Sequence, residues 1–394
     1  MEVDSQIQFD NTQVAFSYKS DAELRKANLI FTLVNHPSIA SIATGLVKAS
    51  LALKLPVKGV IKKTVFDHFC GGETIAKCKE NIRHLAEYNV GTILDYSVEG
   101  AKTEEGFDHT CQEILKTFEA AKGNEHIPFC VFKITGMADA ALLEKIQNGD
   151  KLQDEEHKAF DRVKQRVDAI CAKAYEYQVP VLMDAEESWI QNPVDKLSYE
   201  MMRKYNKANA IVFNTFQMYR KDMLTNLKHA FHEAAMHDYF LGVKMVRGAY
   251  MEQERARAED LGYADPICET KEATDDSFNK GLAFCVDQKQ RITLMCGSHN
   301  EYSNRYLTVL MQKHGMLPND KRVWFAQLLG MSDNISFNLA KAGYRVVKYV
   351  PFGPVASVMP YLFRRAEENT SVAGQSSREL TLIRKELQRR KNHR

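Results

Sequence analysis

The sequence of 394 residues lacks a charge excess of either sign, since 53 Lys and Arg residues offset 51 Asp and Glu residues to a net charge of +2. Electrostatic capture of nucleic acid requires a dominant excess of Lys and Arg, so we expect no nucleic-acid partner. Long apolar runs are missing too, because no window reaches the roughly 18 residues, both uncharged and apolar, that cross a bilayer. The first residues resemble neither a secretory signal nor an Arg-rich transit segment. These absences predict an intracellular, cytoplasmic protein.

Three short motifs are also absent. No C-x-x-C pair occurs among the eight cysteines, and Cys130 and Cys296 lie inside apolar runs, which predicts reduced thiols that pack as small hydrophobes. No H-x-H or H-x-x-x-H pair occurs, and the Asp and Glu clusters lack a histidine partner, so we expect no metal site. No G-x-G-x-x-G occurs, and any nucleotide cofactor must therefore bind outside a Rossmann frame.

What the sequence does contain is an alternation of short, β-rich apolar runs with long amphipathic segments. The apolar runs predict strands at 91–97, 128–136, 179–187, 209–217, 241–250, 291–300, 322–330 and 344–353. A typical intervening segment is 154–178, whose apolar residues recur at the i, i+3, i+4 spacing of a helix. Eight strands joined by helical crossovers imply a parallel sheet, and eight is the number that closes into a (β/α)8 barrel.

The predicted strands begin apolar and finish polar. Their polar ends are Asp95 and Glu99, Lys133, Asp184 and Glu187, Gln217, Lys244 and Arg247, His299, Gln327, and Lys348 with Tyr349. In a (β/α)8 barrel the carboxyl ends of the strands line the active site. A polar residue can simply mark where one strand stops, but eight in succession favour a catalytic rim.

The segments outside the barrel are predicted to be helical. We divide the chain into an N-terminal helical region at 1–90, the barrel at 91–375 and a basic C-terminal helix or tail at 376–394. Segment 42–69 has an apolar face with interspersed lysines, and packing against the barrel is favoured over a membrane-surface helix. The charged stretch 252–281 is long enough to cover the site. The tail is expected to be solvated, with a weak attraction to anionic lipid as the alternative.

The sharpest local feature is YLFRRAEENTS at 361–371, directly after the eighth strand. Neighbouring residues of a helix point about 100° apart, so Arg364 and Arg365 cannot both lie on the exposed face of a barrel helix. A helix that overhangs the barrel would let both guanidinium groups converge on one carboxylate or phosphate, which they bind bidentately. The alternative is a solvated basic pair that forms salt bridges with Glu367 or Glu368.

Two lysines at strand ends raise a rival chemistry. Lys133 or Lys244 could form a Schiff base in an aldolase-like barrel, which requires a neutral amine in an apolar or cation-rich environment. Lys133 follows the apolar run FCVF, but Asp184 and Glu99 are available in the same barrel. A lysine that pairs with a carboxylate stays charged, so this alternative is the less favoured one.

Five motifs in this order resemble the proline dehydrogenases. They are DAEES (184–188), VKMVRGAY (243–250), GSHN (297–300), YVPFG (349–353) and YLFRRAEENTS (361–371). The resemblance runs from about Gly91 to Ser371 and so covers the whole predicted barrel. It implies a distorted (β/α)8 barrel that binds FAD at the carboxyl ends of its strands, with the last helix over the mouth.

The resemblance also implies a substrate site. Arg364, Arg365 and Lys133 correspond to the residues that hold the substrate carboxylate, and Tyr349 to the tyrosine that shapes the proline ring pocket. The remaining residues that pack on the ring are Tyr250, Leu329 and Tyr361. Glu99 corresponds to a gate that closes on Arg364, and Asp184 to the active-site aspartate of the family.

For the flavin, the family's contacts fall on a second set of residues. Gln217 and Lys244 resemble those at the isoalloxazine edge. The others are Asp184, the backbone at Val246, Gly248 and Ala249, the His299 side chain and Glu368. Some bacterial members have arginine on the fifth strand and tryptophan after the GAY tripeptide, where this chain has Lys244 and Met251. The chain therefore resembles the monofunctional, eukaryote-like branch more closely.

The implied activity is oxidation of L-proline to Δ1-pyrroline-5-carboxylate, by hydride transfer to flavin N5, with electrons passed to a membrane quinone. Because the quinone lies in a membrane, the protein could contact the inner face of that membrane peripherally. A hydroxyproline dehydrogenase of the same family is the closest alternative, and the aromatic Tyr349 favours proline. A Schiff-base lyase that uses Lys133 and a non-catalytic barrel scaffold are the more distant alternatives.

Overall fold

The computed structural model describes residues 7–34, 59, 62–98, 101–371 and 375–393. Its strands form a closed barrel in chain order, as predicted. They are β1 (Val90–Tyr96), β2 (Phe129–Lys133), β3 (Val181–Asp184), β4 (Val212–Gln217), β5 (Leu241–Val246), β6 (Ile292–Gly297), β7 (Val323–Leu328) and β8 (Val346–Phe352). Each lies within or one residue outside its predicted run, because buried parallel strands are near-continuous apolar segments.

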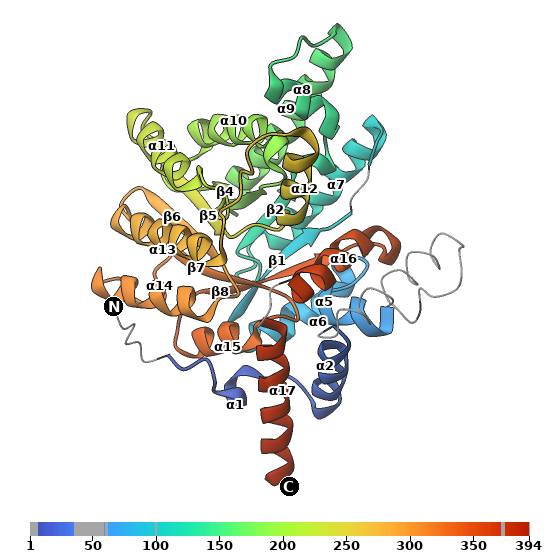
Figure 1. The fold of residues 1–394 in the computed structure, drawn as a ribbon, viewed down its shortest axis with the longest axis vertical. Coiled ribbons are helices and arrows are strands. Elements are labelled where there is room, and N and C mark those ends of the chain that lie inside the picture. Colours follow the sequence, from blue (N-terminus) through green and yellow to red (C-terminus); the bar gives the residue numbers. More distant parts are fainter. Residues whose placement is uncertain (1–6, 35–58, 60–61, 99–100, 372–374, 394) are drawn as a thin grey trace. The chain divides into compact units, whose positions relative to one another are not determined.

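The helices follow the strands in regular alternation (Figure 1). Before the barrel lie α1 (Thr12–Ala15), α2 (Asp21–Val34), the π-helical turn η1 (Lys62–Phe66), α5 (Asp67–Phe69) and α6 (Ile75–Ala86). The crossovers are α7 (Glu104–Ala121), the 3-10 turn η2 (Ile134–Gly136), α8 (Ala140–Asn148), α9 (Asp154–Tyr177), α10 (Ser188–Tyr205), α11 (Met223–Met236), α12 (Met251–Leu261), α13 (Lys271–Asp287), α14 (Glu301–Lys313) and α15 (Asp333–Lys341). The chain ends with α16 (Val355–Ser371) and α17 (Gln375–Asn392).

The chain forms two compact units. One comprises Met1–Asp4 and Gly100–Phe325, and the other comprises Ser5–Glu99 and Ala326–Arg394. We call them the central unit and the terminal unit and describe each by itself. The predicted domain boundaries at 90 and 375 stay a prediction.

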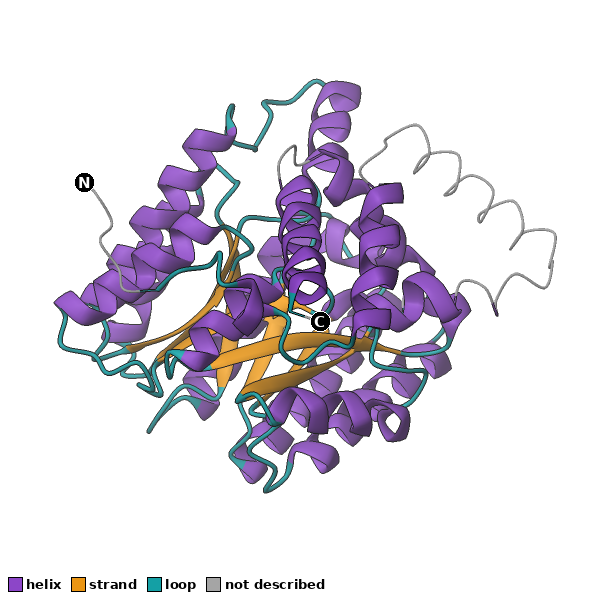
Figure 2. Ribbon diagram, turned by 90° about the horizontal axis from the view of Figure 1, so that it is seen from below, coloured by secondary structure: helices purple, strands orange, loops and turns teal. Residues whose placement is uncertain are grey.

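In the central unit, β2 to β6 pair in parallel with their neighbours. Helix α7 packs against β2, α10 against β4, and α13 against β5 and β6. The strands carry the apolar interior while the helices lie on their outer side (Figure 2). The long helix α9 begins with a capping box between Gln153 and Glu156 and ends at Tyr177, before the C-cap Gln178, which has a left-handed backbone with φ 53°. It therefore matches the helix predicted at 154–178.

In the terminal unit, β1 pairs with β8 along its whole length, from Val90 opposite Val346 to Tyr96 opposite Phe352. One apolar cluster gathers around α16 and includes Phe66, Phe69, Met331, Val358 and Leu362. A second one joins α1, α2 and α17 through Phe16, Leu24, Phe31, Leu382 and Ile383. The two ends of the chain thus share a hydrophobic core.

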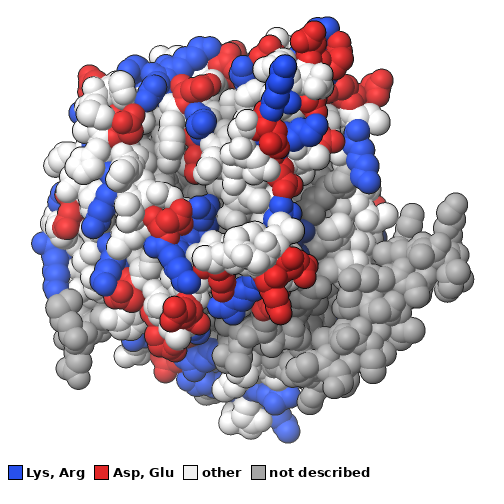
Figure 3. Space-filling view, turned by 45° about the horizontal axis from the view of Figure 1, so that its top comes forward, with Lys and Arg blue, Asp and Glu red and all other residues white. Residues whose placement is uncertain are grey.

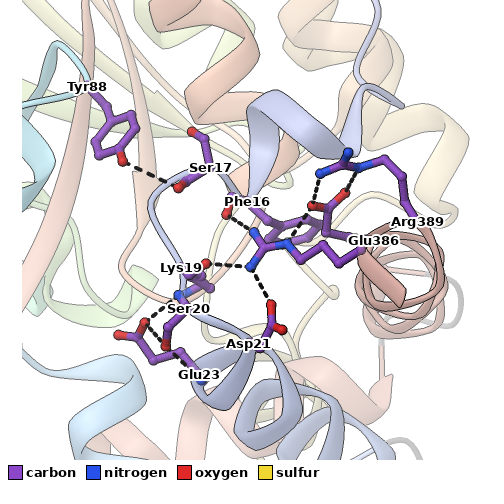
Figure 4. A network of polar contacts seen from close by, with 10 residues as sticks. Phe16, Ser17, Lys19, Ser20, Asp21, Glu23, Tyr88, Glu386 and Arg389 are labelled. Carbon is purple, nitrogen blue, oxygen red and sulfur yellow. Dashed lines mark hydrogen bonds and ion pairs between the residues drawn. The ribbon is translucent and has the colours of Figure 1, made fainter. Parts of the chain in front are cut away.

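The basic C-terminal tail is not simply solvated, so that expectation is wrong. In Figure 4 the end of α17 lies against the turn between α1 and α2. Arg390 donates to the carbonyl oxygens of Phe16 and Lys19, each at 2.8 Å, and forms an ion pair with Asp21 at 2.9 Å. The buried Glu386 binds Arg390 at 2.7 Å. Fixed partners from the start of the chain therefore occupy this arginine.

The cysteine prediction is confirmed, because all eight cysteines are buried free thiols. Within the described ranges, no helix is both long and apolar enough to cross a membrane. Figure 3 shows acidic and basic side chains interspersed on one face of the molecule, as the near-neutral balance leads one to expect. Most of segment 42–69, the proposed amphipathic helix, lies outside the described residues.

Candidate active site

The carboxyl ends of β2 to β5 bring polar side chains of the central unit to one rim. Lys133 ends β2, Asp184 ends β3 and Gln217 ends β4. Lys133 is opposite Asp184 in the β2–β3 register. Paired residues of neighbouring parallel strands point to the same face of a sheet, so these two side chains share a face.

Lys244 of β5 reaches across β4 to Asp184. Its Nζ lies 2.5 Å from Asp184 Oδ1, and both side chains are largely buried. A buried charge is tolerated only when it is paired, and each of these groups supplies the counter-charge of the other. Lys133, Lys244 and Asp184 together carry a net charge of +1, which suits a site for an anion or an electron-rich ring.

Gln217 is buried and has a fixed orientation. Its Nε2 donates to the backbone oxygen of Glu186 at 2.6 Å. A carbonyl oxygen can only accept, so the amide nitrogen must face Glu186 and Oε1 must point the other way. Within the described part of the chain, Gln217 Oε1 accepts no hydrogen bond. Buried acceptors in native proteins nearly always have a donor, and none of the described residues supplies one to this atom.

Glu186 is a residue that the sequence reasoning missed. It is the most buried carboxylate of the DAEES motif and accepts hydrogen bonds from the Thr135 backbone N at 3.0 Å and from the Thr135 hydroxyl. Burial raises the pKa of Glu186 to about 7, although the Thr135 donors act against this rise. Three carboxylates in five residues signalled a site, but no periodicity shows which of them turns inward.

The turn after β5 is built around Arg247, which the sequence pattern predicts only as one of the polar strand ends. Its guanidinium donates to Asp275 Oδ1 at 2.7 Å and to the hydroxyls of Ser298 and Ser303 at 2.9 Å each. This network joins the ends of β5 and β6 to α13 and α14. His299, half-buried, lies in the same β6–α14 turn.

Gly248 follows Arg247 with φ 142°. A Cβ at this position would lie 2.4 Å from the ring of Tyr219, so only glycine fits. Val246 and Ala249 beside it are half-buried and Tyr250 is buried. The backbone predicted to meet the cofactor is therefore held tightly on the side of Tyr219.

The terminal unit holds two of the three tyrosines predicted to pack on the ring, Tyr349 and Tyr361. Tyr349 of β8 and Leu329 are both buried, and Leu329 N donates to Tyr349 O at 2.9 Å. Tyr361 of α16 is buried in the apolar cluster around α16. Arg364, one turn further along the helix, is half-buried.

Lys348 does not share the environment of Tyr349, contrary to the expectation that both reach the barrel mouth. It is fully buried, and its Nζ lies 2.9 Å from Asp333 Oδ1 and donates to Met331 O at 2.5 Å. Burial lowers the pKa of Lys348, whereas the lysine holds the pKa of Asp333 below its usual range. Successive residues of a strand face opposite sides, so only one of the two can point into the barrel.

Three predicted residues cannot be placed. Glu99 lies outside the described residues, and the side chains of Arg365 and Glu368 are likewise not described. The gate, the second arginine and this cofactor contact therefore stay predictions. In the part of the chain that the structure covers, no group of His, Cys, Asp and Glu residues could hold a metal ion.

Comparison with known proteins gives a consistent result. The family model for proline dehydrogenase matches residues 78–378. The mitochondrial proline dehydrogenase 1 of Dictyostelium discoideum is 34% identical over 86% of this chain and 67% of its own length. The human mitochondrial proline dehydrogenase 1 is 42% identical over 61% of this chain and 40% of its own length. The CarD protein of carbapenem biosynthesis from Pectobacterium carotovorum subsp. carotovorum is 33% identical over 82% of this chain.

The fold has solved counterparts. Proline utilization A from Bdellovibrio bacteriovorus, inactivated by N-propargylglycine, superposes with a TM-score of 0.70 at 18% identity, over 93% of this chain and 37% of its own. The chain spans 59% of the length of its Caenorhabditis elegans relative and 37% of its Drosophila melanogaster relative. The similarity to eukaryotic sequences agrees with the branch that Lys244 and Met251 indicate. The family match across most of the chain, on a closed eight-stranded barrel, shows that this chain belongs to the proline dehydrogenase family.

Proposed function

We propose that this protein oxidises L-proline to Δ1-pyrroline-5-carboxylate with FAD as cofactor and passes the electrons to a quinone. The observation that carries the proposal is the family match over residues 78–378, on a barrel whose strand ends present Lys133, Asp184, Gln217 and Lys244 at one rim. FAD, when bound, accepts the hydride from the substrate carbon and is the redox group.

The residues of the central unit fit a flavin. The polar edge of an isoalloxazine offers carbonyl oxygens and an N–H. Lys244 supplies an ammonium donor, and Gln217 Oε1 is a buried acceptor without a partner in the described chain. Asp184, the backbone of Val246, Gly248 and Ala249, the His299 side chain and Glu368 complete the proposed set of contacts.

The substrate carboxylate is proposed to bind Lys133, Arg364 and Arg365. Three cationic donors around one carboxylate fix its orientation and so hold the ring in one pose. Tyr349, Leu329, Tyr361 and Tyr250, all buried, then pack against the apolar ring. Hydride loss is easier from a neutral amine than from an ammonium, so the substrate nitrogen should be deprotonated. Exclusion of water by a Glu99–Arg364 gate would also assist the step.

The carboxylate assignment is tested by Arg365→Lys. An ammonium cannot reproduce the two parallel hydrogen bonds of a guanidinium, so we expect the KM for proline to rise at least about tenfold, equivalent to ~1.4 kcal/mol. The exposed Arg378, changed to lysine, is the matched control and should leave the KM unchanged. An unaltered KM in Arg365→Lys would refute the assignment, whereas wild-type protein that holds no cofactor and does not oxidise proline would favour a non-catalytic barrel.

Two rival activities have distinct signatures. A hydroxyproline dehydrogenase would need space for a hydroxyl group, which the buried aromatic Tyr349 does not favour. A Schiff-base lyase would need a neutral Lys133, yet this lysine shares a face with Asp184 in the β2–β3 register. Colourless protein that borohydride traps covalently with a carbonyl substrate would favour the lyase.

A further inference from the structure

We propose that Glu186 is a positioning residue, which clamps the turn after β3 to the end of β2 and thereby aims the carbonyl oxygen of Gln217 into the site. The inference rests on the proposed function only for the identity of the group that Gln217 meets. It goes beyond the predicted contacts, because those use Asp184 and Gln217 but leave Glu186 without a role.

The first step is the clamp itself. The Glu186 carboxylate takes two hydrogen bonds from one residue, Thr135, through its backbone N at 3.0 Å and through its hydroxyl. Thr135 lies two residues after Lys133, in the turn η2 that ends β2. The carboxylate therefore fixes the turn that follows Lys133 relative to the turn that follows Asp184.

The second step concerns the backbone of Glu186, whose N–H and C=O each form a hydrogen bond with a different glutamine. Glu186 N donates to Gln191 Oε1 at 2.9 Å, and Glu186 O accepts from Gln217 Nε2 at 2.6 Å. Gln191 in turn donates to Asp195, which also accepts from Asn214 of β4 at 2.8 Å. The position of the Glu186 backbone thus determines where the Gln217 amide lies.

The third step is that this arrangement leaves one polar atom unused. Gln217 Oε1 is buried and accepts nothing from the residues that the structure describes. The hydrogen bond from Gln217 Nε2 to Glu186 O prevents the side-chain amide from rotating by 180° to bring Oε1 to another donor. Under the proposed function, this acceptor meets an N–H of the cofactor, and Glu186 acts on that contact through Gln217 rather than directly.

The clamp also has a pH dependence. Burial raises the pKa of Glu186 to about 7, while the Thr135 donors and the charge of Lys133 lower it and Glu187 raises it. The paired Lys244 and Asp184 occupy the same rim. Hydrogen bonds to an ionised carboxylate are about twice as strong as neutral ones, so the clamp tightens as pH rises through 7.

The experiment compares four variants of the flavin-loaded protein with wild type between pH 5.5 and 9, using the flavin absorption spectrum without substrate. We expect the wild-type spectrum to shift with a midpoint near 7 and Glu186→Gln to abolish the shift. Thr135→Val, which removes the hydroxyl donor, should raise the midpoint by about one pH unit, whereas Thr135→Ser should restore it. Asp168→Asn removes a carboxylate that also binds a hydroxyl, that of Tyr205 at 2.8 Å, and should leave the midpoint unchanged.

A titration in Glu186→Gln identical to that of wild type, or equal midpoints in the Val and Ser variants of Thr135, would overturn the proposal. Protein that binds no flavin would refute the proposed function instead. In that case the carboxyl band of the infrared spectrum follows Glu186 directly, provided that every protein compared also carries Glu379→Gln, because burial raises the pKa of Glu379 to about 7 as well. A band that titrates near pH 7 and is absent in Glu186→Gln supports the clamp, and its persistence in the variant overturns it.

Discussion

Tyr349 is the residue that we propose selects the ring substrate. It is buried in β8, and its backbone oxygen accepts from Leu329 N, another residue predicted to pack on the ring. Replacing the phenol with a small hydroxyl side chain opens space where a 4-hydroxyl group could lie. We expect Tyr349→Ser to raise the ratio of hydroxyproline to proline kcat/KM by about tenfold or more, equivalent to ~1.4 kcal/mol.

Tyr302→Ser is the matched control, because Tyr302 is 51% exposed on α14. It should leave both kcat/KM values as they are. If the substrate ratio stays constant in Tyr349→Ser, Tyr349 does not select the substrate.

At the residue scale, the sequence predicts which residue types lie at the rim of the barrel but not the direction in which each side chain points. Asp184 and Gln217 were predicted at the rim, and they end β3 and β4 there. Glu186 was missed because a turn has no periodicity that separates inward from outward positions. Lys348 was placed beside Tyr349, although strand alternation turns it to Asp333. The partner of a buried lysine, distant in sequence, is not visible from the local pattern.

At the element scale, α17 is held by an ion-pair network as much as by apolar packing. Glu386 has no exposed side-chain surface and binds both Arg389 and Arg390. Arg390→Ala removes one of its two counter-ions and three further contacts with the turn between α1 and α2. Because removal of one partner from a buried ion pair costs more than the pair contributes, we expect a loss of about 2–4 kcal/mol in the free energy of unfolding.

The loss should appear as a lower Tm and as faster hydrogen exchange in α17 and α1. Arg384→Ala is the control on the same helix, since Arg384 is exposed and its hydrogen bonds to Asn28 and Thr32 are long, at 3.3 and 3.5 Å. Equal effects of the two substitutions would mean that the docked arginine contributes nothing specific.

Glu379, near the start of α17, should make the stability of the folded protein depend on pH. Glu379 accepts from Ser332 N at 2.9 Å, and burial together with Asp333 raises its pKa to about 7, against Lys348 and Lys19, which lower it. The folded state therefore keeps this proton up to about pH 7, whereas the unfolded chain releases it near its ordinary value of 4.5. Stability from this group is present below that value and is lost as pH rises from there to 7.

Glu379→Gln stays neutral and removes that loss. We expect its Tm, relative to wild type, to rise between pH 5 and pH 8. Glu155→Gln, at a side chain that is 79% exposed, should show no such trend. A Tm difference that is independent of pH would show that Glu379 ionises normally in the folded protein.

Element ranges were the most predictable feature of this chain. Each predicted strand has an observed counterpart, and the helix at 154–178 matches α9. The run 128–136 was too long, since β2 ends at Lys133 and a 3-10 turn follows. The tail was predicted to be solvated because its composition is basic. Its partners, Phe16, Lys19 and Asp21, lie more than 350 positions earlier in the chain.

At the scale of the whole molecule, counting the strands was enough to predict the barrel, because a parallel sheet of eight βα units closes on itself. The division into a central and a terminal unit was not predicted. It places β1 and β8, from opposite ends of the chain, in one unit. Hydrophobic periodicity describes the elements one by one and carries no information on how strongly distant elements pack together.

The central claim, that this chain holds a flavin which proline reduces, is tested most directly by the visible absorption spectrum of the purified protein under anaerobic conditions. We expect flavin bands that bleach when L-proline is added and return on exposure to an electron acceptor. Protein without these bands even after incubation with FAD, or with bands that proline leaves unchanged, would contradict it.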